Sequence, residues 1–132
     1  MSYLLDTHAF IFSVFGIPQL SKRAGELILD EENQIFISIV TFWEIALKYS
    51  LGKLDLQGVL PDDMPAVCIQ IGFSIIELSS KDAASSYRLK KIFHKDPFDR
   101  MLIWQAINNN LSLISKDTAF NNYADLGLNV VW

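Results

Sequence analysis

Short apolar runs rich in Leu, Ile and Val alternate along this chain with longer segments of helical period. This alternation is typical of a parallel sheet that is covered by helices, so the pattern predicts an α/β fold with three layers and a central parallel sheet of four to five strands. The expected strands are Tyr3–Asp6, Gln34–Ser38, Phe73–Leu78 and Leu111–Ser115, with a weaker one at Asn129–Trp132. The expected helices are Thr7–Phe15, Ser21–Glu31, Val40–Leu51, Pro61–Ile71, Lys81–Lys91 and Pro97–Asn109.

Residues that commonly begin or end helices support these boundaries. Ser21 and Ser80 are expected to be N-caps, because a hydroxyl there can accept a free backbone N–H. Pro61 and Pro97 suit the first position of a helix, where the missing N–H costs nothing. Asn110 tolerates the left-handed conformation that often ends a helix.

The length and composition predict one compact domain over residues 1–132. The chain is 51% hydrophobic and has six glycines and four prolines, which is enough apolar material for a core and leaves no linker. No apolar run is long enough to cross a bilayer, and the first residues lack the features of a signal peptide, so we expect a soluble, cytoplasmic protein. The single cysteine, Cys68, excludes an internal disulfide and is expected to be a buried thiol.

The net charge of −4 argues against a protein that holds nucleic acid by a broad basic face. It does not exclude a nuclease, because bound metal would cancel several of the negative charges. Basic residues also concentrate in one region, at Lys90, Lys91, His94, Lys95 and Arg100. That concentration fits a substrate-binding segment and a solvated helix end equally well.

Four acidic residues fall at the edge of apolar segments or inside them: Asp6, Glu44, Asp99 and Asp117. A buried ionised carboxylate without a partner is costly, and two of them about 4 Å apart repel by about 4 kcal/mol at an effective dielectric near 20. A cluster of four would therefore require a cation. Oxygen ligands without a His or Cys cluster favour Mg²⁺ or Mn²⁺ over zinc.

Each of the four has a structural alternative. Asp6 ends a strand, where open α/β sheets bind ligands, but it or Thr7 could instead cap the next helix. Asp117 also follows a strand and could simply form a turn. Glu44 lies in a helix with apolar residues nearly all round, and a pair with Lys48 at i,i+4 contributes only about 0.2–0.5 kcal/mol, which is too little to explain a buried carboxylate.

A purely structural role is best supported in the segment that begins at His94. Asp96 followed by Pro97 is a good helix start, with Asp96 as the N-cap, and for Asp96 we prefer this structural role. Asp99 would lie in the first turn of the same helix, where it could complement the helix dipole and still point towards the carboxyl edge of the sheet.

Four short motifs follow one another along the chain. They are Tyr3-Leu4-Leu5-Asp6-Thr7-His8, Ser38-Ile39-Val40-Thr41-Phe42-Trp43-Glu44, His94-Lys95-Asp96-Pro97-Phe98-Asp99-Arg100 and Leu113-Ile114-Ser115-Lys116-Asp117. Each motif alone is weak, but in this order the chain resembles the PIN-domain ribonucleases and, within them, the VapC-type toxins of bacterial toxin–antitoxin pairs. The resemblance covers essentially the whole chain.

The resemblance implies a set of site residues. The acidic quartet of the family falls on Asp6, Glu44, Asp99 and Asp117, as catalytic and metal-binding residues. Ser115 takes the place of the small hydroxyl residue before the last acid, where many relatives have Thr, and Asn110 stands where many have Gly. Both replacements keep the needed property. Further residues are expected to support the site or to contact the substrate: Thr7 and Asp96 for support, and His94, Lys95, Arg100 and Lys116 for substrate binding.

The resemblance also implies an activity and partners. Members of this group are typically dimers that cleave RNA with Mg²⁺ or Mn²⁺ and are silenced by an antitoxin whose tail blocks the acidic pocket. Our leading hypothesis is therefore metal-dependent hydrolysis of RNA phosphodiester bonds. Two alternatives remain: an interaction module whose acidic pocket binds a basic partner segment without turnover, and an enzyme that cleaves DNA or other phosphate esters.

Overall fold

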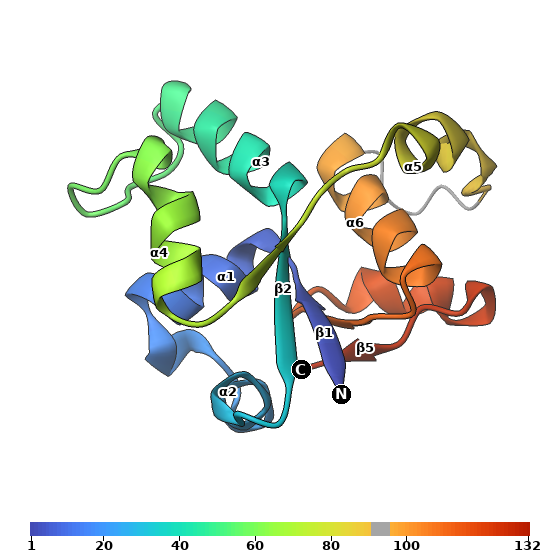
Figure 1. The fold of residues 1–132 in the computed structure, drawn as a ribbon, viewed down its shortest axis with the longest axis horizontal. Coiled ribbons are helices and arrows are strands. Elements are labelled where there is room, and N and C mark those ends of the chain that lie inside the picture. Colours follow the sequence, from blue (N-terminus) through green and yellow to red (C-terminus); the bar gives the residue numbers. More distant parts are fainter. Residues whose placement is uncertain (91–95) are drawn as a thin grey trace.

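A single sheet of five parallel strands forms the centre of the computed structural model, which describes residues 1–90 and 96–132. The strands are β1 (Ser2–Leu5), β2 (Gln34–Ser38), β3 (Ser74–Ile76), β4 (Ser112–Ile114) and β5 (Val130–Val131). Their order in the sheet is β3-β2-β1-β4-β5, and each neighbouring pair is parallel. Helices cover both faces, which confirms the predicted α/β fold with three layers (Figure 1).

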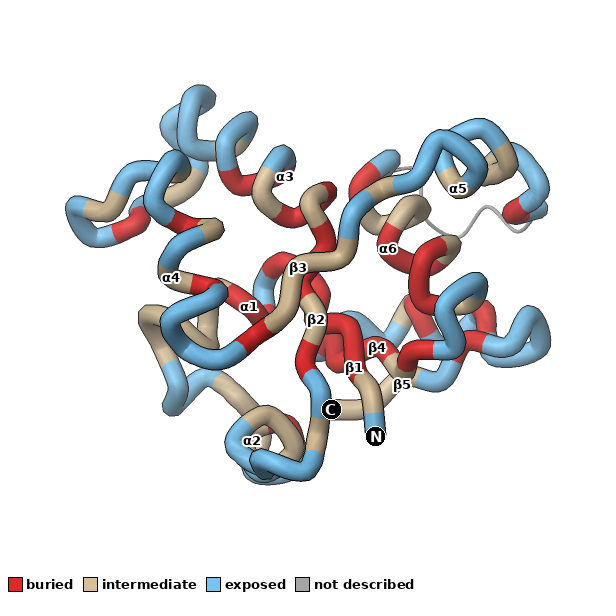
Figure 2. Tube along the Cα trace, in the orientation of Figure 1, coloured by how far each residue is buried: buried red, intermediate tan, exposed pale blue. Residues whose placement is uncertain are grey.

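Alternate residues of the central strand face two separate hydrophobic cores. Tyr3 and Leu5 of β1 point into one core, whereas Leu4 between them points into the other, as the period of two in a strand requires. Residues of α1 (Thr7–Phe15), α2 (Lys22–Leu29) and α4 (Met64–Gln70) fill the first core. Residues of α6 (Pro97–Asn108) and of the 3₁₀ helix η4 (Thr118–Leu126) fill the second. Figure 2 shows the buried positions gathered in β1, β2 and β4 and on the sides of the helices that face the sheet.

The remaining helices lie above the carboxyl ends of the strands or connect them. Helix α3 (Ile39–Ser50) follows β2 directly and contacts α6, α1 and the 3₁₀ helix η2 (Pro61–Asp63). Helix α5 (Ser80–Ser85) and the 3₁₀ helix η3 (Ser86–Arg88) pack against α6, and η1 (Ile17–Gln19) follows α1. The part of the chain that the structure describes contains no helix long and apolar enough to span a membrane.

Several predicted boundaries need correction. The predicted helix over residues 61–71 begins as η2 and becomes α4 only at Met64, and the one over residues 81–91 is divided into α5 and η3, with Lys91 outside the described residues. Ser79 rather than Ser80 caps α5, because its hydroxyl accepts the N–H of Asp82 at 3.0 Å. The helix η4 was not predicted, and there a 3₁₀ helix follows the turn at Asp117.

Other local predictions are confirmed. The Ser21 hydroxyl accepts the N–H of Ala24 at 3.0 Å and caps α2, and Pro97 is the first residue of α6. Asn110 has a φ of 54° after α6, in the left-handed region. Cys68 is a buried thiol, and its burial raises its pKa to about 11, so it stays protonated at neutral pH.

The strand order decides where a site can form. The chain moves outward from β1 to β2 and β3 on one side, and β4 and β5 lie on the other side of β1. The connections after β1 and β4 therefore leave the sheet in opposite directions, which opens a crevice at their carboxyl ends. Asp6 directly follows β1, and Ser115 directly follows β4.

Candidate active site

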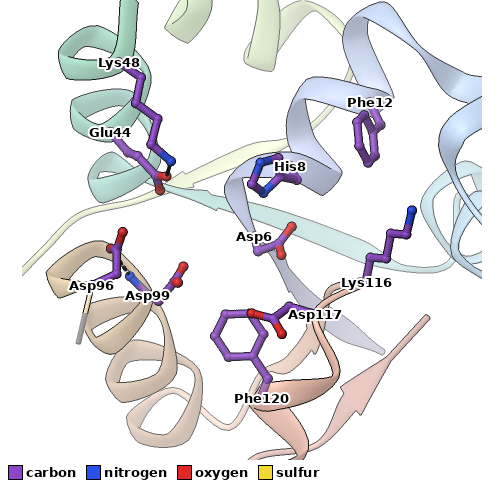
Figure 3. A pocket seen from close by; sticks show the side chains of 10 residues that line it. All are labelled: Asp6, His8, Phe12, Glu44, Lys48, Asp96, Asp99, Lys116, Asp117 and Phe120. Atoms are coloured by element: carbon purple, nitrogen blue, oxygen red, sulfur yellow. Dashed lines mark hydrogen bonds and ion pairs between the residues drawn. The ribbon is translucent and has the colours of Figure 1, made fainter. Parts of the chain in front are cut away.

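A cavity of about 450 Å³ lies at this crevice, above the carboxyl ends of β1 and β4. Side chains from the start of α1, from α3, from the start of α6 and from the segment after β4 line it (Figure 3). The lining residues are Asp6, His8, Phe12, Glu44, Lys48, Asp96, Asp99, Lys116, Asp117 and Phe120. The fold thus brings the four predicted acidic residues, which are spread over more than a hundred positions of the chain, to one cavity.

Asp6 is both the N-cap of α1 and a wall of this cavity. Its Oδ1 accepts the N–H of Ala9 at 2.8 Å, and its Oδ2 accepts the hydroxyl of Ser115 at 2.5 Å. The residue is only 6% exposed, and its burial raises the pKa of the carboxyl group. The hydrogen bonds from Ser115 and Ala9 and the charge of His8 oppose that rise, and the charge of Glu44 adds to it. The cap and the site were alternatives in the sequence, but the structure combines them.

Ser115 connects the ends of β1 and β4. Besides donating to Asp6, its buried hydroxyl accepts the N–H of Asp117 at 3.0 Å. Asp117 then caps η4, since its Oδ1 accepts the N–H of Ala119 at 2.9 Å. One hydroxyl therefore fixes the Asp6 carboxylate and the backbone that presents Asp117.

Glu44 reaches the cavity from α3 and is only 3% exposed. Its Oε1 accepts the hydroxyl of Thr7 at 2.7 Å, and its Oε2 forms an ion pair with Lys48. Thr7 also lies 3.2 Å from the hydroxyl of Thr41, and it does not cap α1. The pair with Lys48 was the structural alternative for Glu44. It is present, but the carboxylate also has this second, buried partner.

The ammonium of Lys48 stays charged in this setting. Burial acts to lower the pKa of Lys48, but the hydrogen bond to Glu44 and its charge, together with Asp96 and Asp99, outweigh burial and raise the pKa. Lys48 therefore faces carboxylates from two helices, α3 and α6.

The start of α6 supplies the remaining acidic wall. Asp96 caps the helix as predicted, since its Oδ1 accepts the N–H groups of Phe98 at 2.8 Å and Asp99 at 3.1 Å. Asp99 lies in the first turn and also lines the cavity. A carboxylate at this place is favoured by the positive end of the helix dipole.

The donors of this cavity fit Mg²⁺ or Mn²⁺ in kind, because they are carboxylate oxygens. The tight cluster that we expected is nevertheless not formed: within the described residues, no three His, Cys, Asp or Glu side chains are gathered closely enough to hold a metal ion. The hydrogen bonds above give the physical reason, since Asp6 is held by Ala9 and Ser115, and Glu44 by Thr7 and Lys48.

Of the residues predicted to contact the substrate, the structure places one at the cavity and one away from it. Lys116 lines the cavity, whereas the Arg100 guanidinium donates to the carbonyl of Leu89 at 2.7 Å and does not line it. His94 and Lys95 lie outside the described residues. Sequence analysis also missed His8, Phe12 and Phe120 as lining residues. His8 and Phe12 are one helical turn apart directly after Asp6, with ring centroids 6.3 Å apart, and this spacing could have indicated them.

Comparison with known proteins places the chain in a family context. The sequence model of one family, described as the PIN domain, matches residues 3–126. No curated protein sequence matches the chain.

Solved structures resemble the whole chain. A chain of VapBC2 from Rickettsia felis, solved bound to a DNA fragment from its promoter, aligns with a TM-score of 0.69 and 18% identity, covering 99% of this chain and 98% of that one. A chain of FitAcB from Neisseria gonorrhoeae aligns with a TM-score of 0.67 and 22% identity, covering 100% and 97%. A chain of a toxin–antitoxin complex from Klebsiella pneumoniae aligns with a TM-score of 0.59 and 20% identity, covering 98% and 96%. At these identities the likeness concerns the fold.

Proposed function

Because the chain belongs to the PIN domain family, we propose that it is a metal-dependent endoribonuclease and the toxin of a toxin–antitoxin pair. The observation that most supports this proposal is the cavity at the switch between β1 and β4, into which Asp6, Glu44, Asp99 and Asp117 converge from four elements. A surface used only to bind a partner does not require carboxylates from so many separate segments.

In this proposal Asp6, Asp99 and Asp117 hold Mg²⁺ or Mn²⁺, and Glu44 is a further ligand or positions water. The bound ion would supply a nucleophilic water at neutral pH and stabilise the charge that develops on the phosphate. Ser115 keeps the Asp6 carboxylate turned to the cavity, and Thr7 does the same for Glu44. The cap made by Asp96 fixes the helical turn that carries Asp99.

The other side of the cavity has a different chemistry, and it supports a nucleic-acid substrate. Phe12 and Lys116 lie away from Asp96, Asp99 and Glu44 in Figure 3, and His8 lies between the two groups. Aromatic faces stack on bases and a lysine neutralises a phosphate, which is how proteins hold single strands. We therefore expect an unpaired strand to enter with its phosphate near the carboxylates and a base near Phe12.

An antitoxin partner is part of the proposal. The structural neighbours include VapBC2 and a complex that is described as a toxin–antitoxin complex, and both align over nearly the full length of this chain. A basic segment of such a partner would compete with the substrate for the acidic cavity. We also expect a homodimer, as in the group that the sequence resembles.

The test is cleavage of RNA by the purified protein. A mixed cellular RNA pool is incubated with Mg²⁺, Mn²⁺ or EDTA, alongside the Asp99→Asn and Asp117→Asn variants. The matched control is Asp62→Asn, which removes an exposed carboxylate from η2, outside the cavity. We expect metal-dependent cleavage by the wild type and the control, and a loss of at least a hundredfold in both cavity variants, because each loses a charged ligand.

Other outcomes separate the alternatives. Equal or faster cleavage of single-stranded DNA, or hydrolysis of small phosphate esters without RNA cleavage, would replace RNA as the substrate class. No cleavage of any substrate with either metal, by a protein of confirmed fold, would favour the interaction module.

A further inference from the structure

Glu44 is held by the protein itself on both carboxylate oxygens. Oε1 accepts the buried hydroxyl of Thr7 at 2.7 Å, and Oε2 is paired with the ammonium of Lys48. The Glu44 side chain is only 4% exposed, so water contributes little to its solvation. A cation that enters the cavity therefore finds Glu44 already neutralised.

The two partners of Glu44 differ in their freedom to move. Thr7 is buried in the first turn of α1 and also contacts Thr41, so its hydroxyl is fixed by the fold. Lys48 lies one turn after Glu44 in α3, and its ammonium is at the end of a flexible side chain that is 35% exposed. Lys48 can thus turn into solvent without any movement of the backbone.

The surroundings of the ammonium match those that attract a divalent ion. Lys48 lines the same cavity as Asp96 and Asp99, and the charges of both act on it. Its single positive charge thus lies on the acidic side of the cavity, next to the carboxylate that the proposed metal site needs (Figure 3). It offsets the mutual repulsion of these groups when no metal is bound.

We propose that Lys48 is an internal counter-ion that competes with the divalent cation for Glu44. In the metal-free protein Lys48 holds Glu44 against α3, and in the metal-bound protein Lys48 turns outward and leaves Oε2 to the cation or its water. This inference rests on the proposed metal site. It assigns Lys48 a positioning role, since Lys48 acts through Glu44.

Removal of the Lys48 charge should tighten metal binding. The measurement is calorimetric titration of Mn²⁺ into the metal-free protein. We expect Lys48→Met to lower the dissociation constant about tenfold, because Glu44 then has no ammonium that competes with the cation. Lys48→Arg keeps the positive charge and a side chain long enough to contact Glu44, so its affinity for Mn²⁺ should stay within threefold of the wild type. If Lys48→Met does not fold, Lys48→Gln replaces it, with the same expected direction.

A second lysine of the cavity provides the matched control. Lys116 is exposed, lies beside Asp117, and makes no ion pair with any other described residue. Lys116→Met removes the same charge from the same cavity but cannot release Glu44. We expect it to change the affinity less than threefold. An equal gain in Mn²⁺ affinity in both variants would mean that only the net charge matters, and it would overturn the proposal. An unchanged or weaker affinity in Lys48→Met would also overturn it.

A double-mutant cycle tests whether Lys48 acts through Glu44. In a Glu44→Gln background, Lys48→Met should change the Mn²⁺ affinity no more than Lys116→Met does, because the pair has already been removed. A full tenfold gain in that background would contradict the proposed coupling. Asp99→Asn identifies the site itself: wild-type binding that Asp99→Asn leaves unchanged would refute the metal site and this inference together, whereas binding lost in Asp99→Asn but insensitive to Lys48→Met would refute the inference alone.

Discussion

Asp6 illustrates how one side chain can serve the fold and the proposed chemistry together. Its two oxygens accept hydrogen bonds from the backbone of Ala9 and from Ser115, and its burial raises its pKa. The hydrogen bonds need only an acceptor, whereas cation binding needs a charge. Asn in place of Asp6 therefore removes the charge and keeps one of the two acceptors, because its amide nitrogen donates and does not accept. In the metal-free protein no cation offsets the cost of the buried charge.

In the metal-free protein, we expect Asp6→Asn to be as stable as the wild type at neutral pH or more stable, and Asp6→Ala to be less stable than Asp6→Asn by about 0.5–2 kcal/mol. Asn keeps an oxygen for the N–H of Ala9, its amide N–H can donate to the Ser115 hydroxyl in place of the bond that Asp6 accepts, and the buried charge is lost, whereas Ala also loses the cap. Chemical denaturation in EDTA measures both. A clear loss of stability in Asp6→Asn would mean that the charge itself supports the helix start.

The raised pKa of Asp6 also predicts how the stability difference between the wild type and Asp6→Asn depends on pH, and the same denaturation experiment measures it. Below the usual pKa of 3.8 the Asp6 carboxyl is protonated in the folded and the unfolded chain, so it costs nothing. As the pH rises above 3.8, the unfolded chain ionises first because the folded pKa is raised, and the folded state loses stability until its own pKa is passed. The advantage of Asp6→Asn over the wild type should therefore grow between pH 4 and pH 7. A constant difference would contradict the raised pKa.

The sequence predicted which acidic residues lie at the cavity better than it predicted the contacts that hold them. The positions of Asp6, Glu44, Asp99 and Asp117 at the edges of apolar segments placed all four at the cavity that the structure contains. The i,i+4 spacing also indicated the pair of Lys48 with Glu44, which the structure contains. The sequence could not show that Thr7 holds the other oxygen of Glu44, because that contact depends on how α1 packs against α3. Their catalytic and metal-binding roles stay predictions.

At the scale of elements, the start of α6 determines where Asp99 lies. Pro97 fixes the first helical position, and Asp96 satisfies two of the N–H groups that every helix leaves without an internal partner. Both features could be seen in the sequence. The result is a rigid first turn from which Asp99 projects into the cavity.

Because Asp96 also lines the cavity, its two possible roles need to be distinguished. Asp96→Ala should lose about 0.5–2 kcal/mol of stability through the missing cap, whereas Asp96→Ser keeps an acceptor and should lose little. If Asp96 acts through the cap, Asp96→Ser retains most of the RNA cleavage. Thermal unfolding and cleavage assays on both variants measure this. Loss of cleavage in Asp96→Ser with an intact fold would instead make the charge of Asp96 part of the site.

The helices that sequence reasoning misplaced most are short or have 3₁₀ form. Residues 61–63 and 86–88 form 3₁₀ turns beside short helices, and a 3.6-residue period over a few residues does not distinguish the two. The helix η4 buries Phe120 and Tyr123 against the second core, and its 3₁₀ form is what the sequence did not indicate. The helices α1 and α6, which an Asp residue caps at the start, were predicted within one residue.

At the scale of the whole molecule, the parallel sheet directs all strand ends to one side and so gathers acidic residues that are distant in sequence. The chain has a net charge of −4, and five carboxylates line one cavity with two lysines and a histidine. Like charges at this density oppose folding, and the ion pair of Lys48 with Glu44 offsets only part of that repulsion. The fold is thus expected to be more stable when a divalent cation occupies the cavity.

We therefore expect Mg²⁺ or Mn²⁺ to stabilise the wild type against thermal unfolding. A ligand that binds only the folded state adds about 2.7 kcal/mol when its concentration is one hundred times its dissociation constant. Asp99→Asn should lose most of this gain, and NaCl at equal ionic strength should not reproduce it, since screening acts on exposed charges more than on a buried site. An equal gain in NaCl, or in Asp99→Asn, would mean that the cations act on the surface of the protein, and the carboxylates of the cavity would then need another explanation.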